Sequence, residues 1–349
     1  MKGNTTRVAA MALTLVACTE FEGPIEPAPA RSPVDADAAF STASASFGSK
    51  IVFTSDSGAP NVSTEIYVAN PDGSEQRQLT ETAGNSNGPA WSPNGRLIAF
   101  HSNRGGGFEE SDIYVMNADG SDVRRLTNLY ALGLGGAHFG NWSPNGRQVV
   151  LNSFWGGGRK PREIYVVDVD GNGLTNLTNH SADDIRPDWS PDGRRIAFQS
   201  NRTRNSDDTA NHEIWLMNSD GTGLLQMTSS PGVDAAPEWS PNGRQIAFQS
   251  TRNGNTDIYV IDADRPETPD APPVRLTTAP RADAKPSWSP DGRRIAFHRD
   301  VAAFGEVHGE VFTMNADGTD QVMITRPVAK AFHGFPSWAQ GHAAWPQAR

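Results

Sequence analysis

The sequence predicts an all-β fold, a six-bladed β-propeller made of four-stranded antiparallel blades. Trp-Ser-Pro-Asn/Asp-Gly-Arg occurs five times at a spacing of about fifty residues, which indicates an array of one supersecondary unit. Short apolar runs bounded by Gly, Pro, Asn and Asp follow each copy, as is typical of strands and turns. No part of the repeat has a convincing helical period. The copies begin at Trp91, Trp142, Trp189, Trp239 and Trp288.

Each unit contains four expected strands in a fixed order. The first strand ends at the repeat Trp, and a Pro two positions earlier suits an edge strand that needs no N–H. A Ser-Pro-Asn/Asp-Gly turn follows, in which Pro93 presets φ and Gly95 supplies positive φ. The runs 97–102 and 112–117 form the second and third strands, and a short run ending in Leu-Thr forms the fourth. We expect each Trp to fill the space between neighbouring blades.

The two ends of the repeat region predict how the ring closes. The first unit opens at Lys50 with a run that matches the second strand of the other units, so its Trp strand is missing. Phe335-Pro336-Ser337-Trp338 is a degenerate copy of that strand. We therefore expect the C-terminal Trp strand to complete the first blade, which leaves no free sheet edge in the ring.

The motif P-x-W-S-P-D/N-G-R-x-I-A-F-x-S, followed by D/E-I-Y-V-M-N-x-D-G and L-T, resembles the TolB-type β-propeller repeat over residues 50–341. WD40-like repeats share the turn but end a strand in Trp-Asp, which this chain lacks. The resemblance implies a six-bladed propeller in the cell envelope that binds proteins. TolB proper also carries an α/β domain before the propeller, whereas here we expect a tether in its place and the propeller alone.

The first residues predict export. Lys2 and Arg7 precede a short apolar run that ends at Ala17, which is typical of a signal peptide over residues 1–17. Leu15-Val16-Ala17-Cys18 resembles a bacterial lipobox, and Cys18 is the one cysteine of the chain. We expect a lipidated Cys18 with a disordered tether over residues 18–48, and the propeller over residues 49–345. Such a lipoprotein would lie on the periplasmic side of the outer membrane or on the cell surface, held to the membrane by its lipid.

The net charge and the lengths of the loops limit the kinds of partner that we expect. The formal net charge of −10 disfavours nucleic acid, because phosphate binding needs positive charge. We expect a monomeric, non-catalytic scaffold that binds an envelope protein or a basic peptide and needs no cofactor. Five long loops are expected on one face of the propeller, the long-loop face, and long loops on a rigid scaffold carry function more often than tight turns do. These loops are 104–111, 128–140, 154–162, 201–212 and 300–309.

Five acids near the first strand of units three to five are candidate ligand-binding residues at the channel mouth. Asp184, Asp234 and Asp283 stand three positions before the repeat proline. Asp188 and Glu238 stand directly before the repeat Trp. If these strands line the channel, the acids could hold Ca²⁺ or another cation, or seat a basic peptide. The structural alternative is that the first three cap the turn into the strand.

Two further repeat positions are polar. An acid opens every third strand, and arginines after the second strand are expected to pair with it; these arginines are Arg104, Arg202, Arg252 and Arg299. One position in every second strand is also polar, which favours a hydrogen-bonded layer around the ring over a metal site. Its members are Thr54, His101, Asn152, Gln199, Gln249 and His298.

Two alternatives to a protein-binding scaffold stay open. A metal-assisted polysaccharide lyase or hydrolase would need convergent histidines, and the candidates are His138, His308 and His333, although no ligand spacing supports them. A glycan-binding module would use exposed aromatic rings as stacking surfaces. The candidate rings are Phe108, Tyr130, Phe154 and Trp155.

Overall fold

The computed structural model of the chain describes residues 50–56, 63–104, 106–107, 110–153, 161–203, 211–303, 306–325 and 333–338. The predicted signal peptide, Cys18 and the tether lie outside the described residues. Over the described part of the chain, no helix has the length and apolar character needed to cross a membrane.

The described residues form six four-stranded antiparallel sheets, here called blades 1 to 6, as the sequence predicts. Blade 1 combines the last strand with the first three, and blades 2 to 6 follow in chain order. Blades 1 to 3 comprise β24 (His333–Trp338), β1 (Ile51–Ser55), β2 (Glu65–Ala69) and β3 (Arg77–Gln78); β4 (Ser86–Trp91), β5 (Leu97–Ser102), β6 (Asp112–Asn117) and β7 (Arg124–Arg125); and β8 (Ala137–Trp142), β9 (Gln148–Ser153), β10 (Ile164–Asp168) and β11 (Thr175–Asn176).

Blades 4 to 6 repeat the same order of three long strands and one short outer strand. They comprise β12 (Asp184–Trp189), β13 (Arg195–Ser200), β14 (Glu213–Asn218) and β15 (Leu225–Gln226); β16 (Asp234–Trp239), β17 (Gln245–Ser250), β18 (Asp257–Asp262) and β19 (Val274–Arg275); and β20 (Asp283–Trp288), β21 (Arg294–Ala303), β22 (Glu306–Asn315) and β23 (Val322–Met323).

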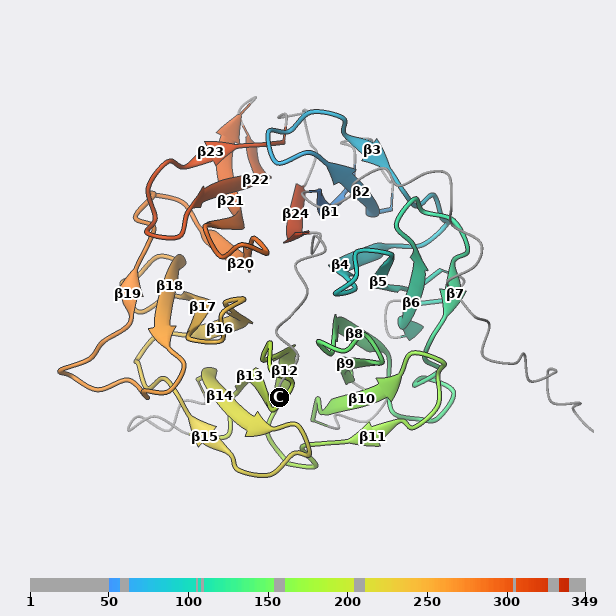
Figure 1. Ribbon diagram of the computed structural model, residues 1–349, viewed down its shortest axis with the longest axis horizontal. Coiled ribbons are helices and arrows are strands. Elements are labelled where there is room, and N and C mark those ends of the chain that lie inside the picture. The colour runs from blue at the N-terminus through green and yellow to red at the C-terminus, as the bar shows by residue number, and fades with distance from the viewer. Residues whose placement is uncertain are drawn as a thin grey trace, which may run out of the picture. The chain divides into compact units, whose positions relative to one another are not determined.

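The ring closes through blade 1, and this confirms the predicted closure. Strand β24 pairs antiparallel with β1, with Trp338 opposite Ile51 and His333 opposite Ser55. Figure 1 shows the blades around a common centre, with β24, β4, β8, β12, β16 and β20 innermost. The Trp-bearing strand of every blade is therefore its inner edge strand, where a Pro removes no ladder hydrogen bond.

The tight turn after the repeat Trp of blades 2 to 6 is held by its own side chains, as β12 and β13 illustrate. Gly193 has a φ of 70°, which a glycine adopts without steric cost. The amide of Gly193 donates to the carbonyl of Ser190 at 2.9 Å. The Ser190 hydroxyl donates to Oδ1 of Asp192 at 2.7 Å and accepts from the amide of Arg195 at 2.8 Å. The Ser, the Asp or Asn and the Gly of the motif thus specify one turn.

Each repeat Trp packs between two blades, as expected. Trp239 of blade 5 packs with Ile214 and Leu216 of blade 4 and with Ile246 and Phe248 of its own blade. The Trp338 cluster joins blade 1 to blade 6 through Val311 and Ala296, which seals the ring. The six repeat tryptophans are 4% to 8% exposed, so each one contributes to a dry interface between blades.

The acid that opens each third strand serves the fold in a way that the sequence analysis did not predict. In blade 2, Oδ1 of Asp112 accepts from the Thr127 hydroxyl at 2.7 Å, and the amide of Ile113 donates to that hydroxyl at 3.0 Å. In blade 4, Glu213 and Thr228 form the same contact at 2.7 Å. This contact ties the third strand to the Leu-Thr segment, and it explains the Thr of the motif.

The loop expected over residues 300–309 is instead a hairpin extension. Strands β21 and β22 are each ten residues long and stay paired from Arg294 opposite Asn315 to Ala303 opposite Glu306. Val301 lies opposite His308 and Ala302 opposite Val307. Small and β-branched residues in these pairs suit a continued ladder better than an irregular loop.

Candidate functional site

The six inner strands share a backbone distortion at one position, three residues before the repeat Trp. Each strand has a bulge there, for example between Ile185 and Asp188 of β12. The residue at this position has a left-handed φ between 52° and 57° in all six blades, although five of the six are not glycine. We call these residues the bulge ring: Gly88, Phe139, Arg186, Ala236, Lys285 and Phe335.

The backbone amides of the bulge ring are held by the polar layer of the second strands. The amide of Arg186 donates to Oδ1 of Asn152 at 3.1 Å, across the boundary between blades 3 and 4. The corresponding bonds elsewhere are Gly88 to Thr54 at 3.3 Å, Ala236 to Gln199 at 3.0 Å and Lys285 to Gln249 at 3.0 Å. The predicted hydrogen-bonded layer is confirmed at these four positions.

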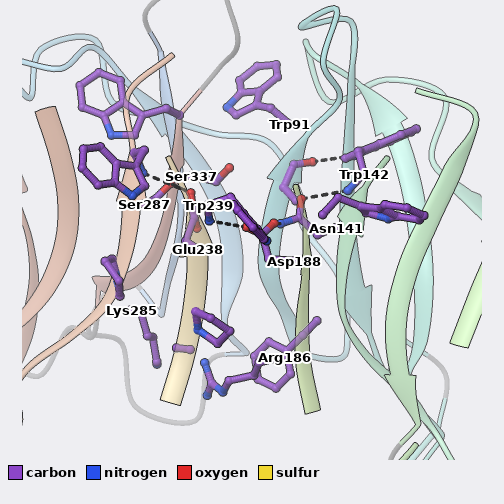
Figure 2. A pocket seen from close by; sticks show the side chains of 18 of the residues that line it. Trp91, Asn141, Trp142, Arg186, Asp188, Glu238, Trp239, Lys285, Ser287 and Ser337 are labelled. Atoms are coloured by element: carbon purple, nitrogen blue, oxygen red, sulfur yellow. Dashed lines mark hydrogen bonds between the residues drawn. The ribbon is translucent and has the colours of Figure 1, made fainter. Parts of the chain in front are cut away.

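The inner strands enclose a cavity of roughly 190 Å³ on the axis of the ring. The bulge ring lines one end of it, and the turn prolines Pro93, Pro191 and Pro241 line the other. The described cavity thus extends from the bulge ring toward the tight-turn face. Figure 2 shows two levels of charge inside it, with Arg186 and Lys285 at one level and Asp188 and Glu238 at the other.

At the bulge ring, two cations meet two phenyl rings. Cζ of Arg186 lies 4.2 Å from the ring centre of Phe139 and 5.9 Å from that of Phe335. Nζ of Lys285 lies 3.2 Å from the centre of the Phe335 ring. The two rings are themselves 5.8 Å apart. Because four large side chains gather at this level, we call it the floor of the cavity.

Asp188, which is buried, and Glu238, which is half-buried, lie one level above the floor and make different contacts. Asp188 accepts from the side-chain amide of Asn141 and, at 2.7 Å, from the backbone amide of Trp239. Oε1 of Glu238 accepts from the Ser287 hydroxyl at 2.9 Å and from the amide of Trp288 at 3.1 Å. Each acid therefore bridges from its own inner strand to a neighbouring one. Both carboxylates accept from neutral donors, and no cation among the described residues forms an ion pair with either of them.

Burial shifts the proton affinities of both levels. It raises the pKa of Asp188 to about 7, against hydrogen bonds from Trp239 and Trp189 that lower it. Burial, together with the charge of Asp188, raises the pKa of Glu238 well above its ordinary value. At the floor, burial lowers the pKa of Arg186 to about 10. Burial and the charge of Arg186 lower the pKa of Lys285 well below its ordinary value.

The other three acids predicted for the mouth lie within their own blades. Asp184, Asp234 and Asp283 are fully buried, and each forms an ion pair with an arginine of its own blade; Arg202 and Arg252 follow the second strand, whereas Arg299 lies within it. The distances are 2.7 Å from Arg202, 2.7 Å from Arg252 and 2.6 Å from Arg299. The expected pairing of these arginines with the third-strand acid is therefore wrong. The register explains the difference, because Asp184 lies directly opposite Ser200, two residues before Arg202.

The remaining candidates do not converge. Among the described residues, no group of three or more His, Cys, Asp or Glu side chains could hold a metal ion. His138 packs against His101 at 4.5 Å between ring centres, and burial lowers its pKa to about 4. His333 packs against Phe53 in blade 1. Tyr130 is 46% exposed, whereas Phe108, Phe154 and Trp155 lie outside the described residues.

Sequence reasoning identified the two acids of the cavity but missed the floor. The missed residues, Arg186 and Lys285, stand directly before the repeat proline. A usable signal existed, since this position carries Gly, Phe, Arg, Ala, Lys and Phe in the six units and follows no structural pattern. Because the backbone at this position is the same in all six units while the side chain differs, the side chain is not fixed by the fold and can determine the chemistry of the cavity.

Solved structures share this fold. TolB from Acinetobacter baumannii has a TM-score of 0.67 at 21% identity, covering 84% of this chain and 67% of that one. The putative TolB from Agrobacterium tumefaciens has a TM-score of 0.61 at 19% identity, covering 83% and 99%. An oligogalacturonate lyase in complex with manganese has a TM-score of 0.53 at 18% identity, covering 80% and 74%. At these identities the likeness shows the fold alone.

No curated protein matches the chain. The family described as the TolB beta propeller domain matches residues 39–136 and 203–339, which together make up more than half of the sequence. These stretches contain three of the five complete Trp-Ser-Pro motifs and the closing strand at Trp338. The chain belongs to the TolB beta-propeller family.

Proposed function

We propose that this chain is a non-catalytic cell-envelope lipoprotein whose propeller binds a protein or a peptide through its central cavity. The observation that carries the proposal is the cavity itself, which is lined by all six inner strands and has charged side chains at two levels. Membership of the TolB beta-propeller family supports a binding scaffold. Buried charged groups on a rigid scaffold are costly to keep without a function or a partner.

The envelope location rests on the first residues of the sequence. The apolar run before Cys18 and the lipobox-like Leu15-Val16-Ala17-Cys18 support export and lipidation. Metabolic labelling with a radioactive fatty acid should mark the protein, and Cys18→Ser should abolish the label. A labelled Cys18→Ser variant would contradict lipidation at this residue.

We propose that the partner approaches from the tight-turn side. The described cavity reaches Pro93, Pro191 and Pro241 on that side. The long-loop face predicted from the sequence stays a prediction, because large parts of loops 154–162 and 201–212 lie outside the described residues. Within the cavity, Asp188 and Glu238 are the candidate acceptors for hydrogen bonds from the partner. The ion pairs of Asp184, Asp234 and Asp283 support a structural role for those three.

Affinity capture from native envelopes tests the proposal. The wild-type protein should retain a defined protein partner that mass spectrometry identifies. The double variant Asp188→Asn/Glu238→Gln keeps the size of both side chains, and should retain at least about tenfold less of it. Asp270→Asn, an exposed acid of the same sign, is the matched control and should behave as wild type.

Equal capture by the double variant and the wild type would move the binding site away from the cavity. Absence of any protein partner would contradict the scaffold itself. In that case the glycan-binding and polysaccharide-cleaving alternatives would be the next to test.

A further inference from the structure

The floor of the cavity holds a cation that the described protein does not neutralise. The guanidinium of Arg186 contacts the faces of Phe139 and Phe335, and no hydrogen bond or ion pair links it to another described residue. Arg202 gives the contrast within the same blade. It also stacks on two rings, Phe198 and Trp215, yet it donates to Asp184 at 2.7 Å as well. Arg186 thus stacks on aromatic rings as Arg202 does, but no described carboxylate pairs with it.

A second cation, Lys285, lies beside Arg186 at the floor. Arg186 and Lys285 both contact the Phe335 ring, and their mutual repulsion contributes to the lowered pKa of Lys285. Asp300 draws that pKa in the opposite direction, but it also contacts His298 at 3.2 Å. Two like charges in a partly enclosed site repel each other more strongly than they would in water. An anion between them would stabilise both.

We propose that the cavity floor is a carboxylate-binding site in which Arg186 and Lys285 hold the anionic group of a ligand between the rings of Phe139 and Phe335. Both cations line the cavity together with Asp188 and Glu238. The planar guanidinium matches the two oxygens of a carboxylate, and the ammonium adds a point charge. This inference deepens the proposed function, on which it rests, by naming the chemistry of the inserted group.

The surroundings favour a carboxylate over a phosphate. The two phenyl rings offer apolar surface to the carbon chain that carries a carboxylate, whereas a free phosphate has no such part. The acids one level above, Asp188 and Glu238, would repel a dianion more than a monoanion. These acids also accept hydrogen bonds, so a peptide could place an acidic group at the floor and its amide donors at the level of Asp188 and Glu238.

NMR titration of the purified ¹⁵N-labelled protein tests the site with three small probes, each used separately. The probes are N-acetylglycine as the carboxylate, inorganic phosphate and the cation glycinamide. N-acetylglycine should give saturable shifts at the bulge ring with a Kd of about 1 mM, as expected for one charged group in a preformed site. Phosphate should bind at least about threefold more weakly, and glycinamide should not saturate.

Four variants test which side chains bind N-acetylglycine. Arg186→Gln and Lys285→Gln should each weaken N-acetylglycine binding about tenfold, whereas Arg186→Lys should keep it within about threefold of wild type. Arg194→Gln removes an exposed cation of the tight-turn face and should leave binding unchanged. The Arg186→Lys variant shows whether a loss in Arg186→Gln reflects charge or misfolding.

Three results would overturn the proposal: no saturable N-acetylglycine binding in the wild type, equal binding by Arg186→Gln, or tighter binding of phosphate than of N-acetylglycine. These outcomes are separate from the fate of the proposed function. Capture of an envelope protein without N-acetylglycine binding would leave the scaffold standing and remove the carboxylate site. N-acetylglycine binding without any captured protein would support the carboxylate site and contradict the protein-binding scaffold.

Discussion

The blade interfaces and the cavity are built on the same six repeats, yet they follow opposite rules. At the interfaces the side chain itself repeats, since a buried Trp packs between neighbouring blades in every unit. At the bulge ring the backbone repeats and the side chain does not, since one left-handed conformation carries Gly, Phe, Arg, Ala, Lys and Phe. The repeated Trp contacts between blades therefore stabilise the fold. The bulge ring provides six positions with a fixed backbone, at which the side chain can differ without altering the arrangement of the blades.

The largest expected effect concerns the interfaces. Trp239→Ala should lower the free energy of unfolding by about 3–5 kcal/mol, because it empties the contact between blades 4 and 5. Urea denaturation followed by circular dichroism measures the loss. Trp215, a half-buried tryptophan of β14 outside the motif, is the control, and its replacement by Ala should cost clearly less. Equal losses of unfolding free energy in the two variants would show that the repeat Trp stabilises the ring no more than a tryptophan outside the motif does.

A second prediction compares two buried acids of the inner strands. Asp283→Asn leaves Arg299 without its carboxylate, so it should cost about 3 kcal/mol. Asp188→Asn removes no ion pair, and at pH 6 it removes an acid whose pKa the folded protein raises, so it should not lower the stability. The same denaturation experiment separates them. If Asp188→Asn proved the more damaging, the acid pair of the cavity would have to be structural.

A third prediction concerns the pH dependence of stability. The folded protein raises the pKa of Asp188 from 3.8 to about 7, so the protonated form is the one that folding favours. Its contribution is present at low pH and is lost as the pH rises from about 4 through 7. Asp188→Asn lacks this titration, so its Tm should fall a few degrees less than that of the wild type between pH 5 and pH 8. Thermal unfolding at both pH values measures the difference, and parallel curves would contradict it.

The smallest expected effect isolates the backbone of the bulge ring. Ala236 has a φ of 52°, so in Ala236→Gly the relief of the left-handed conformation should offset the entropic cost of glycine to within about 0.5 kcal/mol. Ala247 lies in β17 of the same blade, is fully buried and lies opposite Val260 in a regular ladder. Ala247→Gly should cost about 1 kcal/mol or more, because no strain is relieved there. Equal costs would mean that the bulge is unstrained.

The sequence predicted the number of blades, their strand order, the closing strand and the packing of the tryptophans, because each depends on short patterns that repeat. It did not predict which acid each arginine meets, since Arg202 pairs with Asp184 across a strand register that the motif does not state. It also missed Arg186 and Lys285. Their meeting at Phe335 joins blades 4, 6 and 1, and a contact between such distant segments follows from ring geometry rather than from local pattern.

The titration of Lys285 tests most directly whether Arg186 and Lys285 interact as two cations at the cavity floor. The chain has five lysines, so ¹³C-labelled lysine side chains can be resolved by NMR and assigned with Lys285→Arg. We expect the pKa of Lys285 to lie well below 10.5, and to rise both in Arg186→Gln and on saturation with N-acetylglycine. A pKa for Lys285 at the ordinary value of 10.5 that neither change moves would contradict the account.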